Sequence, residues 1–251
     1  MEQIQSDGTV ERINKLIITL RQKYSEKTIK YYEILKQQND ARVMTFNKIH
    51  NTILCYGIVW RNFLDNFADD NKYVKFLNEF NLSMQPIEFK EGFRYSYNMY
   101  ISFGVYIRLF CCLESSLRVI HRELAKQGYF EFQDKFVSID TVMAQIIKHT
   151  KIDEKYKNLV TLLANVRNLM HGFGAFPYDD KPIKYNGTEY IFKNPFVSAN
   201  LVRLDFLLSF FEKDVINMFE AIFNSSIIIS IPFMEDDLDT NLNNYKKYMN
   251  T

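Results

Sequence analysis

The chain has 251 residues, of which 47% are hydrophobic and 24% charged, a composition typical of a folded globular protein rather than a disordered one. Its 31 Lys and Arg residues nearly balance its 30 Asp and Glu residues, and the formal net charge of +1 argues against a protein that coats DNA. Any nucleic-acid site must therefore depend on a local positive field. Only 8 Gly and 5 Pro residues occur, which predicts long helices, and 22 Phe with 16 Tyr predict an aromatic core.

The cysteines and the N-terminal segment indicate a cytoplasmic protein. Cys55, Cys111 and Cys112 are odd in number and lack metal-binding spacing, so we expect reduced, buried thiols. The first residues are polar and acidic, which is unlike a secretory signal. Residues 95–113 have the length of a membrane span, but Arg108 lies inside this segment. A buried core helix is the better interpretation, and no membrane partner is expected.

In the first part of the chain, apolar residues at helical spacing predict helices over 9–38 and 43–67, followed by a shorter helix ending near residue 80. Thr9 is the expected N-cap of the first helix. The sequence "NDAR", residues 39–42, is a short polar break. Residues 81–92 contain a proline and a glycine and are the expected boundary between an N-terminal helical region, 1–90, and the rest.

In the second part, helices are expected over 93–127, 138–149, 154–171 and 199–223. Ser138 and Asp140 are both available to cap the second of these, and Ser198 can cap the last. Apolar and polar residues alternate around Asn186-Gly187, which predicts a tight β-hairpin over 182–193. Residues 91–228 form the expected second domain, and 229–251 a polar C-terminal tail, mobile from residue 234. The predicted fold class is all-α, a helical bundle with one small β-hairpin between its last two helices.

The candidate functional motif is "NVRNLMHGFGAF", residues 165–176. Arg167 and His171 are one helical turn apart, so both side chains project from the same face of a helix. Arginine binds phosphate oxygens bidentately, and histidine takes or gives a proton near neutrality. Asn168 can orient a neighbouring group. Gly172 and Gly174 leave the backbone bare, which allows a nucleic-acid strand to approach. The combination favours phosphoryl transfer without a metal.

The same residues also have structural explanations. A histidine near a helix C-terminus interacts favourably with the helix dipole, and glycine commonly comes directly after a helix. Arg167 can pair with an acidic side chain. Likewise, Glu114 and Arg118 are spaced for a structural ion pair within one helix. Arg118, His121, Arg122 and Lys126 form a basic stripe that either contacts phosphates or is a solvated face.

The sequence "VRNLMHGFG" resembles the Arg-Asn-x-x-His variant of the motif in HEPN-domain proteins, small helical bundles common in prokaryotic toxin–antitoxin and phage-defence systems. Two further features are similar to that family. "CCLESSLRVIHREL", residues 111–124, resembles the Glu-Ser-x-x-Arg helix that precedes the motif helix. The predicted hairpin and apolar last helix resemble the elements that come after the motif helix in such proteins. The resemblance covers roughly residues 95–225, and residues 1–90 lie outside it.

The resemblance implies a metal-independent endoribonuclease that leaves a 2′,3′-cyclic phosphate and works as a homodimer with its motif helices facing each other. It implies RNA as substrate, an antitoxin or other defence-system partner, and no cofactor. The implied catalytic residues are Arg167 as transition-state cation, His171 as general acid and base, Asn168 as orienter and Glu114 as positioning carboxylate. Gly172, Gly174, Arg118 and Ser115 would contact substrate or lie nearby.

Two other functions stay open. Fewer residues separate Arg167 from His171 than in the commoner family motif, and some HEPN proteins are inactive modules that bind RNA, a nucleotide or a partner protein. The apolar last helix and the near-zero net charge also fit such a module. The third possibility is a purely structural helical protein, in which the Arg167–His171 pair ties a helix end to its neighbour.

Overall fold

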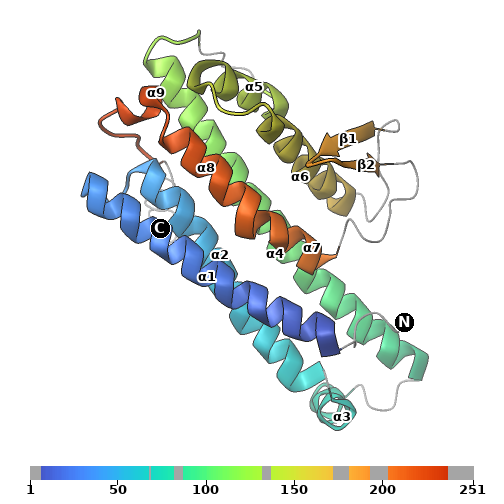
Figure 1. The fold of residues 1–251 in the computed structure, drawn as a ribbon. Helices are drawn as coiled ribbons and strands as arrows, with labels where there is room; N and C mark the ends of the chain where they lie inside the picture. The colour runs from blue at the N-terminus through green and yellow to red at the C-terminus, as the bar shows by residue number, and fades with distance from the viewer. Residues whose placement is uncertain are drawn as a thin grey trace, which may run out of the picture.

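The computed structural model describes residues 7–67, 69–81, 87–131, 137–171, 181–192 and 203–236. They form an all-α bundle with one small β-hairpin, which confirms the predicted fold class (Figure 1). The longer helices are α1 (Asp7–Leu35), α2 (Ala41–Phe67), α4 (Ile87–Lys126), α5 (Ile139–Thr150) and α6 (Lys155–His171). The shorter helices are α3 (Asp70–Glu79), α7 (Leu204–Phe210), α8 (Ile216–Phe223) and α9 (Ser226–Ile229). Strands β1 (Lys181–Tyr185) and β2 (Thr188–Phe192) form the hairpin.

The helix α4 is the central element of the bundle (Figure 1). The antiparallel pair α1 and α2 packs on one side of it, and α5, α6 and the hairpin lie on the other. The α7–α8 segment lies along α4 and also contacts α1, so it joins the two groups. No helix within the described ranges has the length and the apolar character needed to cross a membrane.

Aromatic rings fill much of the core, as the composition predicts. The ring of Phe46 on α2 lies 5.4 Å from Tyr31 on α1 and 5.8 Å from Phe223 on α8, measured between centroids. Further along α2, Phe67 stacks on Tyr97 of α4 at 4.7 Å. Such ring contacts add about 0.5–1.5 kcal/mol each beyond the area they bury. The rings therefore join helices from both ends of the chain into one buried cluster.

The segment expected as a domain boundary is partly helical. The helix α4 begins at Ile87, so Gly92 lies inside a helix and the division at residue 90 falls within α4. The start of α4 is tied to α3, because Arg94 donates to the Asp70 carboxylate at 2.8 Å. The Arg94 guanidinium also lies 4.3 Å from the ring centroid of Tyr73. The N-terminal helices and the motif-bearing helices thus share α4 as a common support.

The β-hairpin is confirmed together with its turn. Asn186 and Gly187 have φ angles of 48° and 77°, the left-handed pair that a two-residue hairpin turn of type I′ requires. The strands pair in antiparallel register from Lys181↔Phe192 to Tyr185↔Thr188. Asn158 of α6 donates to the Lys184 carbonyl at 3.0 Å, so the hairpin is held against the helix that carries the motif.

The last helix is divided where the sequence predicts one segment over 199–223. Its described part consists of α7, a π-helical segment at Phe211–Val215, and α8. In a π turn the backbone hydrogen bonds join residues five positions apart instead of four. The Tyr24 hydroxyl of α1 donates to the Phe211 carbonyl at 2.8 Å. The expected cap Ser198 lies outside the described residues.

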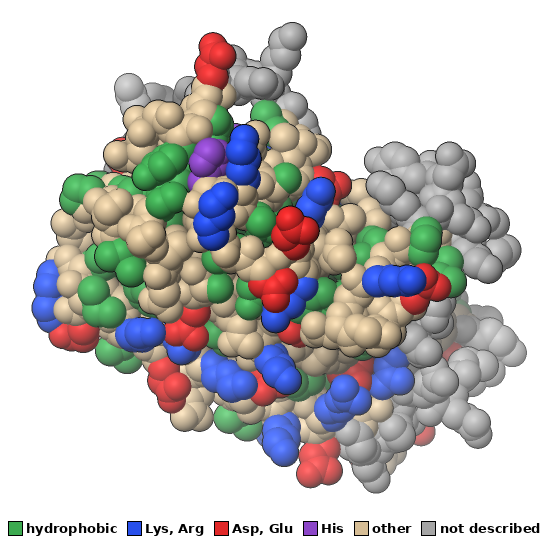
Figure 2. Space-filling model, turned by 45° about the horizontal axis from the view of Figure 1, so that its top comes forward, with side chains coloured by type: hydrophobic (Ala, Val, Ile, Leu, Met, Phe, Trp, Pro, Cys, Tyr) green, Lys and Arg blue, Asp and Glu red, His purple; other side chains and the backbone are tan. Residues whose placement is uncertain are grey.

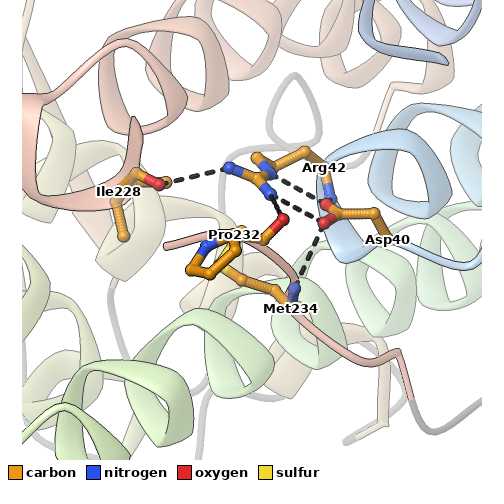
Figure 3. Close-up of polar contacts among 5 residues, drawn as sticks. All are labelled: Asp40, Arg42, Ile228, Pro232 and Met234. Atoms are coloured by element: carbon orange, nitrogen blue, oxygen red, sulfur yellow. Dashed lines mark hydrogen bonds and ion pairs between the residues drawn. The ribbon is translucent and has the colours of Figure 1, made fainter. Parts of the chain in front are cut away.

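Residues 39–42, expected as a polar break, contain a buried ion pair between Asp40 and Arg42 (Figure 3). The helix break lies at residues 36–40, and the side chains of Asp40 and Arg42 are almost fully buried. Arg42 donates to both Asp40 oxygens, at 2.8 and 2.7 Å, and to the carbonyl of Ile228. Asp40 also accepts the amide of Met234 at 3.1 Å. We call these contacts the C-terminal clasp, because they fix residues 228–234 to the α1–α2 turn.

Three smaller predictions are wrong. The helix α1 begins at Asp7, so Thr9 lies inside its first turn rather than at the cap. Cys55 and Cys111 are exposed, and only Cys112 is buried as expected, because the first two lie on outward faces of α2 and α4. Residues 234–236 are not a mobile tail, since the clasp holds Met234, and Asp236 is buried and pairs with Lys48. Residues 237–251 lie outside the described part of the chain.

Candidate functional site

Helix α6 positions the motif residues. Its N-terminus is capped by Asp153, whose carboxylate accepts the Lys155 amide at 2.8 Å. The helix packs on α4 and α5 and carries the hairpin, so its inner face is buried along most of its length (Figure 1). The Tyr106 hydroxyl of α4 donates to the Leu163 carbonyl at 2.6 Å. This bond fixes α6 against α4 one turn before Arg167.

Arg167 is a half-buried cation that rests on an aromatic ring. Its guanidinium carbon lies 4.8 Å from the ring centroid of Phe110 on α4. No carboxylate of the described residues lies within ion-pair distance of it, and its buried Nε has no hydrogen-bond acceptor there. A buried donor without a partner costs about 1–3 kcal/mol. The side chain is therefore held in place but keeps unused donors, which suits an anionic ligand.

The Tyr106 hydroxyl near Arg167 is uncharged. Burial raises the pKa of Tyr106 well above its ordinary value, and the nearby Arg167 charge only partly opposes this shift. Tyr106 thus stays neutral and does not act as a counter-ion. Asn168 is half-buried, whereas Asn165 is buried and its Nδ2 has no acceptor among the described residues. Asn165 was not among the predicted site residues. The sequence does carry a signal for it, because an amide at a position between Leu162 and Leu169 on the apolar face of a helix indicates a buried polar group.

Three motif positions lie partly or wholly outside the described structure. His171 is the last residue of α6, but its side chain lies outside the described part, as do Gly172 and Gly174. The helical backbone places the Cα of His171 one turn beyond Arg167. A joint role of the guanidinium and the imidazole stays a prediction.

The second group of predicted site residues is engaged elsewhere. Arg118 contacts Oε1 of Glu114 through Nε at 3.0 Å and Nη2 at 2.6 Å, and its Nη1 donates to the Val137 carbonyl. Glu114 lies one turn beyond Phe110 on α4, yet its described partner is Arg118 rather than Arg167. Within the described ranges, the structure therefore shows the ion pair that the Glu114–Arg118 spacing permits.

Ser115 belongs to a different polar cluster. Its hydroxyl donates to the Cys112 carbonyl at 3.1 Å and accepts the Lys48 ammonium of α2 at 3.3 Å. Lys48 in turn pairs with Asp236. No hydrogen bond or ion pair between described residues joins Ser115 to Arg167. Ser115 thus supports the junction of α2, α4 and the C-terminal segment.

The basic stripe on α4 also has internal partners. Arg122 donates to the Glu235 carbonyl at 3.2 Å, and Lys126 donates to Glu123 at 2.6 Å. His121 is buried, with its ring 4.6 Å from that of Phe130, and burial followed by the Arg118 charge lowers its pKa. These contacts give the stripe a structural role. Arg167 is therefore the predicted site residue with the clearest unmet demand for an anion.

The comparisons with known proteins supply no relative. No protein-family model, no curated protein and no solved structure matches this chain. The resemblance to HEPN proteins consequently rests on the motif residues and their order along the chain. Among the described residues, no group of three or more His, Cys, Asp or Glu side chains is arranged to hold a metal ion.

Proposed function

We propose that the chain is a metal-independent endoribonuclease of the HEPN type, acting in the cytoplasm in a toxin–antitoxin or phage-defence system. The observation that carries the proposal is the state of Arg167: half-buried, supported by Phe110, and without a carboxylate partner among the described residues. A permanent cation in this state fits a phosphodiester better than it fits a structural role. The order of the motif, the hairpin and the apolar helix is the second support.

The proposed reaction needs two groups one helical turn apart. The His171 imidazole takes the proton of an RNA 2′-hydroxyl, and the resulting oxygen attacks the adjacent phosphorus. The phosphorus–O5′ bond then breaks to give a 2′,3′-cyclic phosphate, and the leaving 5′-oxygen takes up a proton from an imidazolium, which balances the one removed from the 2′-hydroxyl, to become a 5′-hydroxyl. The Arg167 guanidinium stabilises the extra negative charge on the phosphoryl oxygens during this step. Asn168 would orient the phosphate or the imidazole.

The surface charge limits how RNA would be held. Figure 2 shows Lys and Arg side chains interspersed with Asp and Glu on the visible face, in agreement with the net charge of +1. Non-specific RNA binding rises with the number of phosphates neutralised, and each one adds to the salt dependence. We therefore expect RNA contact at few phosphates and a shallow salt dependence. A homodimer that brings two α6 helices together would double the local positive charge.

One observation favours a second candidate function. Glu114, the proposed positioning carboxylate, is bound by Arg118, so no described carboxylate orients the Arg167–His171 pair. A catalytically inactive module that binds RNA or a nucleotide, or that docks on a partner such as an antitoxin, uses Arg167 without needing this carboxylate. It predicts retention of RNA without a cleaved product.

The test is cleavage of labelled total RNA by the purified protein in EDTA, beside Arg167→Ala and His171→Ala. Both variants should lose cleavage by at least about a hundredfold, the usual contribution of a general acid–base group. Arg61→Ala is the matched control, because Arg61 is an exposed arginine whose described partner is Asp65 on its own helix. Equal cleavage by all four proteins excludes the nuclease. Binding measured by fluorescence anisotropy, without any product, identifies the inactive module.

A further inference from the structure

The turn between α5 and α6 borders a pocket of about 480 Å³, within the size range of small-molecule sites. Its apolar part consists of Ala144, Ile147 and Ile152. Ile147 is buried, and the other two are half-buried, so this surface is fixed by the core beneath it. The floor of the pocket is therefore preformed and suits an apolar group of a ligand.

The charged part of the pocket is predominantly basic. Lys148, Lys151, Lys157 and Glu154 line it, so three lysines against one glutamate leave an excess of two positive charges. In the described part of the chain, none of these lysines has a carboxylate within 4.0 Å. The neighbouring Asp153 does not neutralise them, because it binds the amide of Lys155 and pairs with its ammonium at 3.3 Å.

Helix dipoles explain two of these lysines but not the third. Lys148 lies in the last turn of α5 and Lys151 comes next as its left-handed cap, where cations interact favourably with the helix C-terminus. Lys157 lies in the first turn of α6, where the helix dipole disfavours a cation, and that turn contains no acidic residue. An anion between these groups would interact favourably with all three ammoniums. The positive field already reaches His149, whose pKa is lowered by burial and then by Lys148 and Lys151.

We infer that this pocket binds a small ligand that carries a phosphomonoester group on an apolar or aromatic body. The dianion would match the excess of two positive charges, and the body would cover Ala144, Ile147 and Ile152. The pocket lies toward the opposite end of α6 from the motif, since Lys157 and Arg167 are about 15 Å apart along the helix axis. It is thus a separate site, and the inference does not depend on the proposed ribonuclease activity.

Phenyl phosphate is the appropriate probe, with inorganic phosphate and phenol as its two halves. Amide chemical shifts of residues 144–157 should change on titration, with an affinity of about 1 mM for a ligand of this size. Each half alone should bind more weakly. The double variant Lys148→Gln/Lys157→Gln should weaken binding roughly tenfold, since an exposed charge pair typically contributes a few-fold. Ala144→Phe fills the floor without changing charge and should abolish binding.

Two controls complete the experiment. Lys72→Gln/Lys75→Gln removes two exposed lysines from α3 and should leave the affinity unchanged. Arg167→Ala should also leave it unchanged, which separates this pocket from the motif site. Thermal melts verify that each variant is folded. If Ala144→Phe does not fold, the comparison of the two double lysine variants tests the inference by itself. An unchanged affinity in Lys148→Gln/Lys157→Gln would overturn the inference. So would the absence of shifts at 144–157 in the parent protein at phenyl phosphate concentrations up to about ten times the expected dissociation constant.

Discussion

Lys48 on α2 and Asp236 near the C-terminus form a buried ion pair, with 2.7 Å between Nζ and Oδ2. The two side chains are 8% and 3% exposed, so each buried charge is stabilised by the other. Residues 188 positions apart in the sequence are thus fixed to one another beside the clasp.

Removing one partner of this pair should be strongly destabilising. Lys48→Met removes the ammonium that pairs with the buried Asp236 carboxylate, and we expect the free energy of unfolding to fall by about 3–5 kcal/mol. Urea denaturation measures this change. Lys36→Met is the control, because Lys36 forms an exposed pair with Glu33, and its loss should change stability by less than about 0.5 kcal/mol. If both variants lost similar amounts of stability, the burial of the Lys48–Asp236 pair would be contradicted.

The clasp should behave as a local unit in hydrogen exchange. Asp40→Asn removes the charge that holds Arg42 and weakens the acceptor of the Met234 amide. We expect the amides of Ala41 and Met234, which bond across the clasp, to exchange faster in this variant than core amides of α4. Uniform acceleration along the whole chain would instead indicate that the clasp and the bundle open together.

Tyr56 offers a test by pH. Its ring is buried, its hydroxyl has no hydrogen-bond partner in the described structure, and burial raises its pKa. Below about pH 10 the ring is neutral in both folded and unfolded chains. Above that pH the unfolded chain releases the proton and the folded chain keeps it. The free energy of unfolding therefore falls as pH rises, by up to about 1.4 kcal/mol per pH unit.

Tyr56→Phe should remove this contribution. At neutral pH the variant should be as stable as the parent or more stable by about 1 kcal/mol, because an unsatisfied buried hydroxyl is lost. Above about pH 10 its stability should fall less steeply with pH. Denaturation series at several alkaline pH values supply the slope. An unchanged slope would show that the Tyr56 hydroxyl reaches water in the folded state.

Phe110→Leu tests the support of Arg167. The substitution keeps an apolar side chain but removes the ring under the guanidinium, a contact typically worth about 0.5–2 kcal/mol. We expect RNA binding or cleavage to weaken roughly two- to thirtyfold. Phe210→Leu is the matched control, since Phe210 is a buried phenylalanine on α7 in ring contact with Phe206. Equal losses in both variants would assign the effect to stability.

Local sequence signals predicted the local structure well. Asn186-Gly187 specified the hairpin because only residues tolerant of a positive φ fit its turn. Of the two candidate caps of α5, Ser138 and Asp140, Ser138 is the one that caps the helix, and its hydroxyl accepts the Thr141 amide. Helical periodicity located α2, α5 and α6 to within a few residues. In each case the deciding interaction joins residues close together in the chain.

Features that depend on distant partners were not predictable in the same way. The sequence "NDAR" indicates only a short polar break, because the carbonyls that satisfy Arg42 come from Ile228 and Pro232, far along the chain. Distant partners also limit what the sequence predicts about the candidate site. Arg167 and His171 were recognisable from their spacing, but the Phe110 ring beneath Arg167 comes from another helix. Glu114 looked available for the site because its pairing with Arg118 was one of two options that the sequence allowed.

The clasp also bears on how the chain acquires its fold. Asp40 and Met234, whose amide Asp40 accepts, are 194 positions apart. The α1–α2 turn therefore leaves the ribosome long before residues 228–234, which bind it, are synthesised. Until then Lys48 lacks Asp236, and Arg42 lacks the carbonyls of Ile228 and Pro232, so both cations depend on water for part of their stabilisation. Closure of this long loop is thus a late event, and a chaperone or protease would meet the nascent molecule before Lys48 has its buried partner.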